Sequence, residues 1–498
     1  MSGILLDRPL TWRQVGAIAE GNATLALSSA AVERIRAARK LVQSIVEKDL
    51  RAYGVNTGVG ALCDVIVAPA KQRQLSRNIV MSHAVGVGAA LETAAVRAII
   101  AAAINNFAHG YSGVRVEVVE RLATLLERGC VPEVPELGSV GYLTHMAHIA
   151  AVLIGTGAAR VDGERRSGAE ALAAIGLMPL ELEAKEGLSL VNGTPCATGL
   201  AALALTRIER LLDWADLIAA MSFENLGGQL ASFDGAALAL RASRSLAQVG
   251  QRLRGYLAGS AILEASAGRH TQDPLSLRAI PQVHGAVREE FAHAELALDA
   301  ELASVTDNPV VTGTVQAPRA LSEAHAVGAS LGLRSDALSI AMAELAAMSE
   351  RRIDRLVNPL VSNLPPFLAA DSGAGSGFMI AQYTAAALAA DNRRWAAPAS
   401  LDGGVTSALQ EDHLVHATSA ARKLLEVSRN AQTILAIELL AAAQAYDLAP
   451  AAGARAPATD AAYRKVRERI APYRDDHLLA EDIVSACELL HGAPPVAP

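Results

Sequence analysis

Tyr53 and Arg278 are two polar residues whose chemistry could serve a small-molecule site. Tyr53 stands in segment 53–60, which is rich in Gly, Asn and Thr and therefore flexible enough to form a lid. A tyrosine can act as a general base only if its pKa is lowered or its proton transfer is coupled to another group. Arg278 has a planar guanidinium that can bind a carboxylate through two parallel hydrogen bonds. The structural alternatives are an ordinary loop tyrosine and an arginine in a salt bridge.

His83 and Glu411 are the other candidates for contact with a substrate. His83 precedes the run Ala-Val-Gly-Val-Gly at 84–88, and a lone histidine in such an apolar context is more often structural. Glu411 lies in the sequence Gln-Glu-Asp-His, and we expect it to begin or lie within a long helix. Because neighbours on a helix point about 100° apart, Asp412 and His413 would point elsewhere and are interpreted as structural.

Loops and long helices are expected to position these residues. As far as about residue 200, helical patterns alternate with glycine-bearing loops, and catalytic groups are commonly placed in loops on a rigid scaffold. The loops that carry candidate motifs are 53–60, 82–88 and 135–145. Long helical stretches are predicted from apolar periodicity at about 196–257, 319–358 and 403–447.

The pattern predicts three consecutive domains. They are an N-terminal active-site domain with the tyrosine loop at 1–200, a central bundle of long helices at 201–448 and a C-terminal helical cap at 449–498. An Ala- and Pro-rich stretch from about 449 marks the last boundary. Helices that are apolar on nearly every side must be buried by something, and partner copies of the chain are natural candidates.

The composition favours a mainly α-helical protein and excludes several functional classes. Hydrophobic residues make up 51% of the 498 residues and aromatic residues only 3%, with many good helix formers. A net charge of −7 with interspersed signs gives no basic stripe for nucleic acid. Alanine causes the positive mean hydropathy, and no membrane span or signal peptide is predicted. The cysteines have no metal-like spacing, so we expect reduced thiols in a cytoplasmic protein without a metal: Cys63, Cys130, Cys196 and Cys487.

Short motifs are spread in one order over most of the chain. They are Tyr-Gly-Val-Asn-Thr-Gly-Val-Gly at 53–60, Ser-His-Ala-Val-Gly-Val-Gly at 82–88, Gly-Tyr-Ser-Gly-Val-Arg at 110–115, Leu-Val-Asn-Gly-Thr-Pro-Cys at 190–196, Gln-Asp-Pro at 272–274, Ser-Leu-Arg at 276–278, Thr-Asp-Asn-Pro at 306–309, Ser-Gly-Phe-Met at 376–379 and Gln-Glu-Asp-His at 410–413. No single motif is decisive, but their shared order is specific. Together they resemble the histidine/phenylalanine ammonia-lyase family.

The resemblance implies a fold, an assembly and a set of site residues. The fold would be the mainly α-helical ammonia-lyase fold with a long-helix central bundle. The assembly would be a homotetramer in which three chains form each active site. The residues implied are Tyr53 for removal of the substrate's β-proton, His83 for its ring, Asn192 and Arg278 for its α-carboxylate, Gln272 for further substrate binding, and Glu411 near the amine or the ring.

The chain departs from the family pattern around one feature, the electrophile. In the family, the segment corresponding to 138–141 is followed by Ala-Ser-Gly, which condenses into a methylidene-imidazolone, and then by aspartate. Here Gly141 is followed directly by Tyr142, and that aspartate is missing too. Leu275 replaces a tyrosine of the family, and Gly-Asn-Phe-His becomes Ser-Glu-Ala-His at 322–325. Since all these changes surround the electrophile, we expect a site rebuilt to work without this cofactor.

A site without an electrophile suits a leaving group that needs no activation. A quaternary trimethylammonium departs as neutral trimethylamine and has no lone pair with which to attack an electrophile. We therefore expect an ergothionase-like carbon–nitrogen lyase that performs 1,2-elimination on a histidine-type substrate. The preferred reaction is release of trimethylamine from ergothioneine to give thiourocanate. Glu323 or Glu411 could face the cation, and Glu323 and His325 are placed in the substrate site.

Two alternatives remain. One is a conventional histidine ammonia-lyase, which converts histidine to urocanate and ammonia with the methylidene-imidazolone. It would require that an Ala-Ser-Gly segment is missing from the sequence as given. The other is a non-catalytic binding protein on a lyase scaffold, which the joint presence of Tyr53, Asn192, Arg278 and Glu411 argues against.

Overall fold

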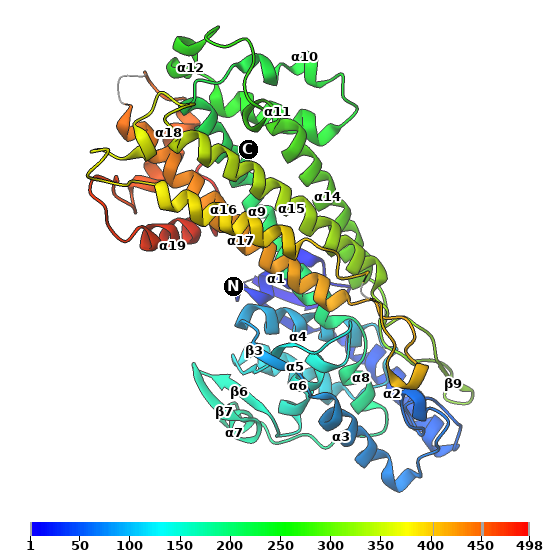
Figure 1. Cartoon of the computed structure of the whole chain (residues 1–498). Coiled ribbons are helices and arrows are strands. Elements are labelled where there is room, and N and C mark those ends of the chain that lie inside the picture. Colours follow the sequence, from blue (N-terminus) through cyan, green and yellow to red (C-terminus); the bar gives the residue numbers. More distant parts are fainter. Residues whose placement is uncertain (1, 402, 450–452, 497–498) are drawn as a thin grey trace. The chain divides into compact units, whose positions relative to one another are not determined.

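The computed structural model describes residues 2–401, 403–449 and 453–496. Helices dominate the fold, which confirms the predicted mainly α-helical class (Figure 1). The chain forms two compact units: unit 1 comprises Met1–Thr206, Ala294–Asp336 and Pro398–Leu425, and unit 2 comprises Arg207–His293, Ala337–Ala397 and Glu426–Pro498. The division into domains at 1–200, 201–448 and 449–498 stays a prediction, and residues 450–452 of its last boundary lie outside the described residues.

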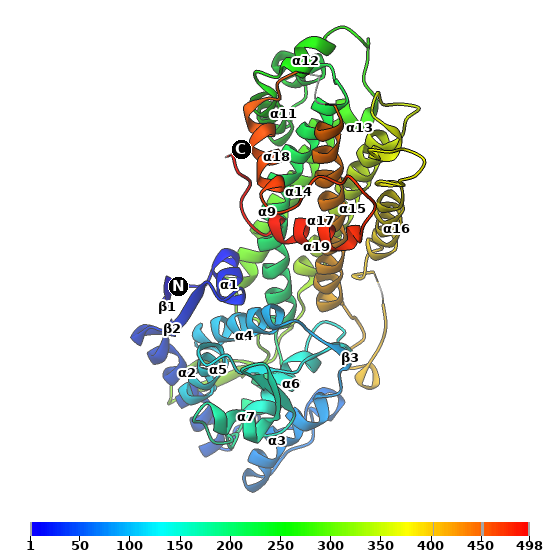
Figure 2. The ribbon, with the colours of Figure 1, turned by 90° about the vertical axis from the view of Figure 1, so that its left-hand side faces the viewer.

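The elements follow one another along the chain with short strands mostly in the first third (Figure 2). The strands are β1 (Ser2–Leu6), β2 (Ala23–Leu27), β3 (Val87–Ala90), β4 (Val131–Pro132), β5 (Pro135–Leu137), β6 (Ala158–Val161), β7 (Glu164–Ser167), β8 (Val310–Gly313) and β9 (Pro318–Leu321). The helices as far as residue 225 are α1 (Trp12–Ala19), α2 (Ser29–Glu47), α3 (Gln72–His83), α4 (Thr93–Ala108), α5 (Val116–Glu127), α6 (Thr144–Leu153), α7 (Gly168–Ala174), α8 (Glu186–Val191) and α9 (Pro195–Asn225). The later helices are α10 (Gly235–Leu238), α11 (Arg244–Leu257), α12 (Ala261–Ser266), α13 (Leu275–Arg278), α14 (Ile280–Leu302), α15 (Ala329–Val357), α16 (Met379–Trp395), α17 (Ala417–Leu448), α18 (Pro457–Arg467) and α19 (Leu479–Leu490).

In unit 1, helices pack around α4, which is alanine-rich and buried on nearly every face. It contacts α1, α2 and α5. Strands β1 and β2 pair in parallel, β3 pairs with β5 and β8 with β9 antiparallel, and β4, β6 and β7 form a sheet in that order. The β3–β5 pair joins two of the segments that carry motifs, 82–88 and 135–145.

Unit 2 contains a bundle of long helices joined by a buried carboxylate. Glu438 of α17 accepts hydrogen bonds from Ser222 of α9 and Ser349 of α15, both at 2.6 Å. The guanidinium of Arg352, also on α15, binds the same carboxylate at 2.6 and 2.9 Å. Because both charged side chains are fully buried, these bonds tie three helices together inside the bundle.

Three predicted helices have different bounds in the structure. The first ends at Asn225 rather than at 257, because Gly227 adopts φ +64° and ends the helix in the left-handed region. The second begins at Ala329, since the residues expected to start it form β9 instead. The third begins at Ala417 and leaves 403–416 outside the long helix. Glu411 was predicted to lie in this helix, and that prediction is wrong.

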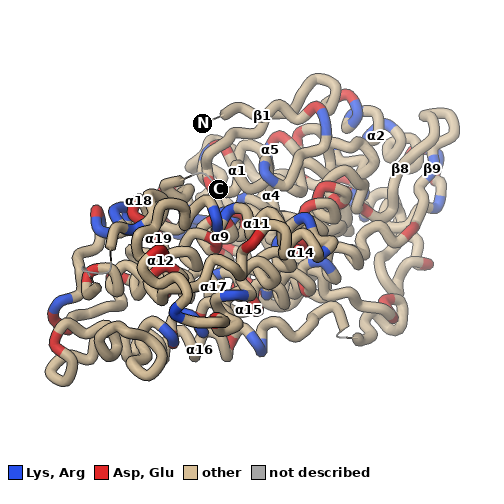
Figure 3. Tube along the Cα trace, turned by 90° about the horizontal axis from the view of Figure 1, so that it is seen from above, with Lys and Arg blue, Asp and Glu red and all other residues tan. Residues whose placement is uncertain are grey.

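One segment, Glu186–Asn225, has the length and apolar composition of a membrane span, but its most apolar window is completely buried inside the protein. That burial is typical of a core helix. Lys and Arg are interspersed with Asp and Glu along the trace (Figure 3). This agrees with the mixed charge pattern of the sequence.

Candidate active site

Loops of unit 1 enclose a cavity of about 980 Å³ that brings together five of the predicted site residues. Its walls include Tyr53, His83, Asn192, Glu323 and Glu411. They come from segments that are far apart in the sequence, from the Tyr53 loop near the N-terminus to the loop that precedes α17. Their roles toward a substrate stay predictions.

Tyr53 is held at the cavity by its own loop. Its Oη accepts a hydrogen bond from the backbone N–H of Gly60 at 3.2 Å. Gly60 adopts φ +56°, and a side chain there would press against Ser407 Oγ, so glycine is required where the two loops meet. The backbone N–H of Ala61 donates to Ser407 Oγ at 3.1 Å. The tyrosine loop is thus fastened to the loop that carries Glu411.

The protonation of Tyr53 depends on its surroundings. Burial raises the pKa of Tyr53, the hydrogen bond from Gly60 lowers it, and the Glu411 carboxylate raises it again. The net shift is upward, so the phenol is protonated at neutral pH. A positive group of a substrate beside the phenol would lower this pKa, which a general base requires.

Tyr142 is a cavity residue that the sequence analysis did not assign to the site. Its hydroxyl donates a 2.6 Å hydrogen bond to Glu411 Oε2, and both residues line the cavity. Burial and the hydrogen bond to Glu411 raise the pKa of Tyr142 well above its ordinary value. The phenol therefore stays neutral and can donate. The departure from the family at Gly141 indicated this place in the chain but not the direction of the side chain.

The loop before α6 fixes Tyr142 through its backbone. Ser139 Oγ donates to the carbonyl of Tyr142 at 3.0 Å, and the N–H of Gly141 donates to Ser139 Oγ at 3.1 Å. Thr418 Oγ1 of α17 donates to the carbonyl of Gly141 at 2.8 Å. The N–H of His416, in the loop that carries Glu411, donates to the carbonyl of Val140 at 2.9 Å, so the two loops are connected independently of the bond between the two side chains.

The residues after Gly141 do not fit an electrophile built from Ala-Ser-Gly. That tripeptide occurs nowhere in the sequence. Tyr142 and Leu143 follow Gly141 directly, and both line the cavity where the family pattern has the tripeptide. This segment therefore does not contain the tripeptide from which the family forms its electrophile.

A buried ion pair holds in place the loop of Asn308, a residue that lines the cavity. Lys185 Nζ lies 3.1 Å from Asp307 Oδ2, with both side chains fully buried, and also donates to Ser189 Oγ at 2.8 Å. Asp307 Oδ1 accepts from the N–H of Asn308 at 2.8 Å. Asn192 Nδ2 donates to the carbonyl of Asn308 at 2.6 Å. The ion pair thereby positions both asparagines.

Glu323 enters the cavity beside its neighbour His325. His325 Nδ1 lies 3.0 Å from Glu323 Oε2, and the N–H of His325 donates to the same oxygen. Asn308 Oδ1 accepts from the N–H of Glu323 at 3.0 Å. Burial raises the pKa of Glu323. His325 itself is outside the cavity lining, so its contact with the site runs through Glu323.

His83 contributes a neutral ring. Burial lowers the pKa of His83, and its Nδ1 lies 3.1 Å from Ser82 Oγ. A neutral imidazole has one donor and one acceptor nitrogen, which suits a polar heterocycle.

Gln272 and Arg278 belong to unit 2 and are not among the residues that line this cavity. Arg278 ends α13, and its Nε is buried without a hydrogen-bond partner. The assignment of Gln272 and Arg278 to a substrate stays a prediction.

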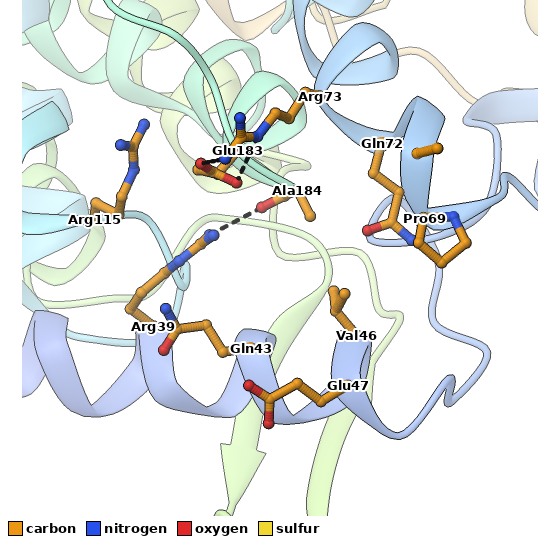
Figure 4. Close-up of a pocket in the computed structure, with 11 residues that line it drawn as sticks. Arg39, Gln43, Val46, Glu47, Pro69, Gln72, Arg73, Arg115, Glu183 and Ala184 are labelled. Atoms are coloured by element: carbon orange, nitrogen blue, oxygen red, sulfur yellow. Dashed lines mark hydrogen bonds and ion pairs between the residues drawn. The ribbon is translucent and has the colours of Figure 1, made fainter.

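A second cavity of unit 1, of about 540 Å³, is lined by Arg39, Arg73 and Arg115 (Figure 4). Each guanidinium has a carboxylate within ion-pair distance. Arg39 lies 3.9 Å and Arg115 2.8 Å from Glu186, and Arg73 lies 2.6 Å from Glu183. Since these charges are paired, we interpret the cluster as structural rather than as an anion site.

Comparisons with known proteins cover the whole chain. The model of the family described as aromatic amino acid lyase matches residues 10–468. Histidine ammonia-lyase of Symbiobacterium thermophilum is 42% identical over 500 residues, which are 100% of this chain and 98% of that relative. Histidine ammonia-lyase of Anaeromyxobacter dehalogenans is 44% identical over 508 residues, covering 98% of this chain and 99% of the relative.

Solved structures agree with this similarity. Histidine ammonia-lyase from Trypanosoma cruzi has a TM-score of 0.90 and 35% identity, covering 98% of this chain and 93% of that one. Ergothionase from Treponema denticola has a TM-score of 0.89 and 27% identity, covering 98% of both chains. The predicted ammonia-lyase fold is thereby confirmed. The chain belongs to the aromatic amino acid lyase family and is a carbon–nitrogen lyase.

Proposed function

We propose that the protein catalyses 1,2-elimination of the α-nitrogen group from a histidine-type substrate. The supporting observation is the single cavity lined by Tyr53, His83, Asn192 and Glu411. In this reaction the phenol of Tyr53 first releases its proton to solvent, and the phenolate then takes a proton from Cβ. The electrons of the broken C–H bond form the Cα=Cβ double bond. The Cα–N bond breaks, and the nitrogen leaves with its electron pair as a neutral amine. His83 holds the ring, Asn192 contacts the α-carboxylate, and Glu411 faces the cationic nitrogen.

Histidine is the first substrate of this proposal, with urocanate and ammonia as products. Two histidine ammonia-lyases are 42% and 44% identical to this chain over nearly its whole length. Ergothionase is 27% identical. These identities reverse the order expected from the sequence, which put ergothioneine first.

A trimethylammonium betaine such as ergothioneine is the second candidate, favoured by a specific observation. The rings of Tyr53 and Tyr142 and the carboxylates of Glu323 and Glu411 line one cavity. Aromatic faces and carboxylates both attract a quaternary ammonium. Such a substrate would release trimethylamine without an electrophile, which fits the direct junction of Gly141 with Tyr142.

The expected result with purified protein is an increase in ultraviolet absorbance from a conjugated acrylate when histidine is supplied. Ergothioneine and hercynine, assayed in parallel, test the second candidate, and the released base identifies the leaving group as ammonia or trimethylamine. Reaction with a betaine alone would restore the substrate order predicted from the sequence. Absence of acrylate from all three compounds would contradict the proposed elimination.

The intact mass of the same preparation is the control for the electrophile. A mass larger than that of the 498 residues by three residues less two waters would show that an electrophile is present and would support histidine, whose amino group needs activation to leave. The mass of the 498 residues alone would support the betaine, whose leaving group needs no electrophile.

We further propose that the chain forms a homotetramer in which Gln272 and Arg278 of a neighbouring copy complete the site. The buried, unpartnered Nε of Arg278 and the position of both residues outside their own chain's cavity lining support this. Arg278→Ala should raise KM and lower kcat because the α-carboxylate loses its charged partner. Arg36→Ala, which removes an exposed arginine paired with Glu33, is the control and should change neither constant. Light scattering measures the assembly, and an unchanged KM for Arg278→Ala would contradict the assignment.

A further inference from the structure

We propose that Tyr142 is a positioning residue that holds Glu411 toward the cationic nitrogen of the substrate, an inference that rests on the function proposed above. The hydroxyl of Tyr142 donates to Oε2 of Glu411 at 2.6 Å. A donor on one carboxylate oxygen fixes the side-chain rotamer and leaves the second oxygen for the substrate. A hydrogen bond from a neutral phenol to a carboxylate is also short and strong, so it holds the carboxylate firmly in place.

The chain on both sides of Tyr142 is fixed, so the direction of its ring is set by the fold. The carbonyl of Gly141, before it, accepts from Thr418 Oγ1 at 2.8 Å. The N–H of Leu143, after it, donates to the carbonyl of Val191 at 3.1 Å. Val191 ends α8 directly before Asn192, which is another wall of the cavity. Tyr142 therefore bonds to Glu411 through its side chain, while the residues on either side of it bond to α17 and to the end of α8.

Glu411 has a second polar neighbour in Tyr53. Its negative charge raises the pKa of the Tyr53 phenol as well as that of Tyr142. When a substrate cation neutralises this charge, the upward effect on the pKa of Tyr53 disappears, and the phenol loses its proton more readily to give the phenolate that acts as the base. Correct placement of Glu411 by Tyr142 thus affects both the binding of the nitrogen and the readiness of the base.

A double-mutant cycle on the full-length protein tests this role. Tyr142→Phe should lower kcat/KM by about 10- to 100-fold, as expected for a hydrogen bond to a charged group. In a Glu411→Gln background the same substitution should have less than about a 2-fold effect, because Tyr142 acts through the carboxylate. Losses that multiply in the double variant would overturn the proposal.

Tyr463→Phe is a matched control. Tyr463 donates an equally short 2.6 Å hydrogen bond to a carboxylate, Asp447, and belongs to unit 2. It should leave kcat/KM unchanged. A loss equal to that of Tyr142→Phe would show that removing any such bond damages the enzyme, and would overturn the specific role.

An ultraviolet titration of tyrosine ionisation at alkaline pH tests the pair without relying on activity. Because the Glu411 charge raises the pKa of both Tyr53 and Tyr142, Glu411→Gln should let two tyrosines ionise at lower pH than in the wild type. Adding Tyr142→Phe should remove one of these two transitions. An unchanged titration in Glu411→Gln would overturn the Tyr142 proposal, whereas a wild type that forms no acrylate would overturn only the proposed function.

Discussion

A Tyr53→Phe variant is expected to assemble normally and to lose about 10²–10⁴-fold in kcat, the contribution typical of general base catalysis. Phenylalanine keeps the ring at the cavity wall but removes the oxygen that accepts the β-proton. The structural cost is small, because the hydrogen bond that this oxygen accepts from the N–H of Gly60 at 3.2 Å is worth about 1 kcal/mol. Steady-state kinetics with the substrate found active, together with the unfolding midpoint, measure the two effects.

The control for Tyr53→Phe is Tyr383→Phe on α16, where the side chain is exposed. This variant should keep the wild-type kcat and unfolding midpoint. Near-full activity of Tyr53→Phe would show that another group removes the proton. A large drop in its unfolding midpoint would show instead that the phenol serves the loop and not the reaction.

Sequence reasoning selected candidate site residues by their chemistry, by the family resemblance and, for Glu323, by a departure from the family pattern. The fold brings Tyr53, His83, Asn192, Glu323 and Glu411 to one cavity, and their roles toward a substrate stay predictions. Spacing alone could not show that they meet, because they lie on loops joined only by tertiary contacts. The resemblance supplied that step.

Tyr142 shows where the sequence was insufficient. The missing tripeptide drew attention to Gly141, but the direction of the next side chain depends on Thr418 and Val191, far away in the sequence. A non-local hydrogen bond decides it, and no local pattern records such a bond. The pairing with Glu411 therefore required the structure.

The predicted start of the third long helix was wrong for a related reason. Residues 403–416 contain enough apolar and helix-forming residues to read as the start of α17. In the structure Ser407, Ala408 and Leu409 have φ values of 51°, 49° and 75°, which a right-handed α-helix does not allow. Contact of Ser407 with Gly60 and Ala61 accompanies this conformation. Tertiary contact thus overrides local propensity where the loop carries Glu411.

The second large effect is expected on stability, from replacing Lys185 with methionine. Lys185 and Asp307 have no exposed surface, and their charged atoms lie 3.1 Å apart. Removing the lysine leaves a buried carboxylate without its cation, which costs about 3–5 kcal/mol. Urea unfolding at a fixed protein concentration measures this, because the self-association proposed above would contribute to the apparent stability.

A double variant, Lys185→Met with Asp307→Leu, separates folding from positioning. It should recover most of the lost stability, because apolar residues of similar volume often replace a buried ion pair without penalty. Its activity should nevertheless stay low, since Asp307 also accepts from the N–H of Asn308 at 2.8 Å and that loop holds Asn192. If the double variant regained activity as well, the ion pair would not be needed to position Asn192, and that part of the prediction would be wrong. If Lys185→Met alone unfolded at the wild-type urea concentration, the pair would not stabilise the fold, and its function at the cavity wall would have to come from Asp307 alone.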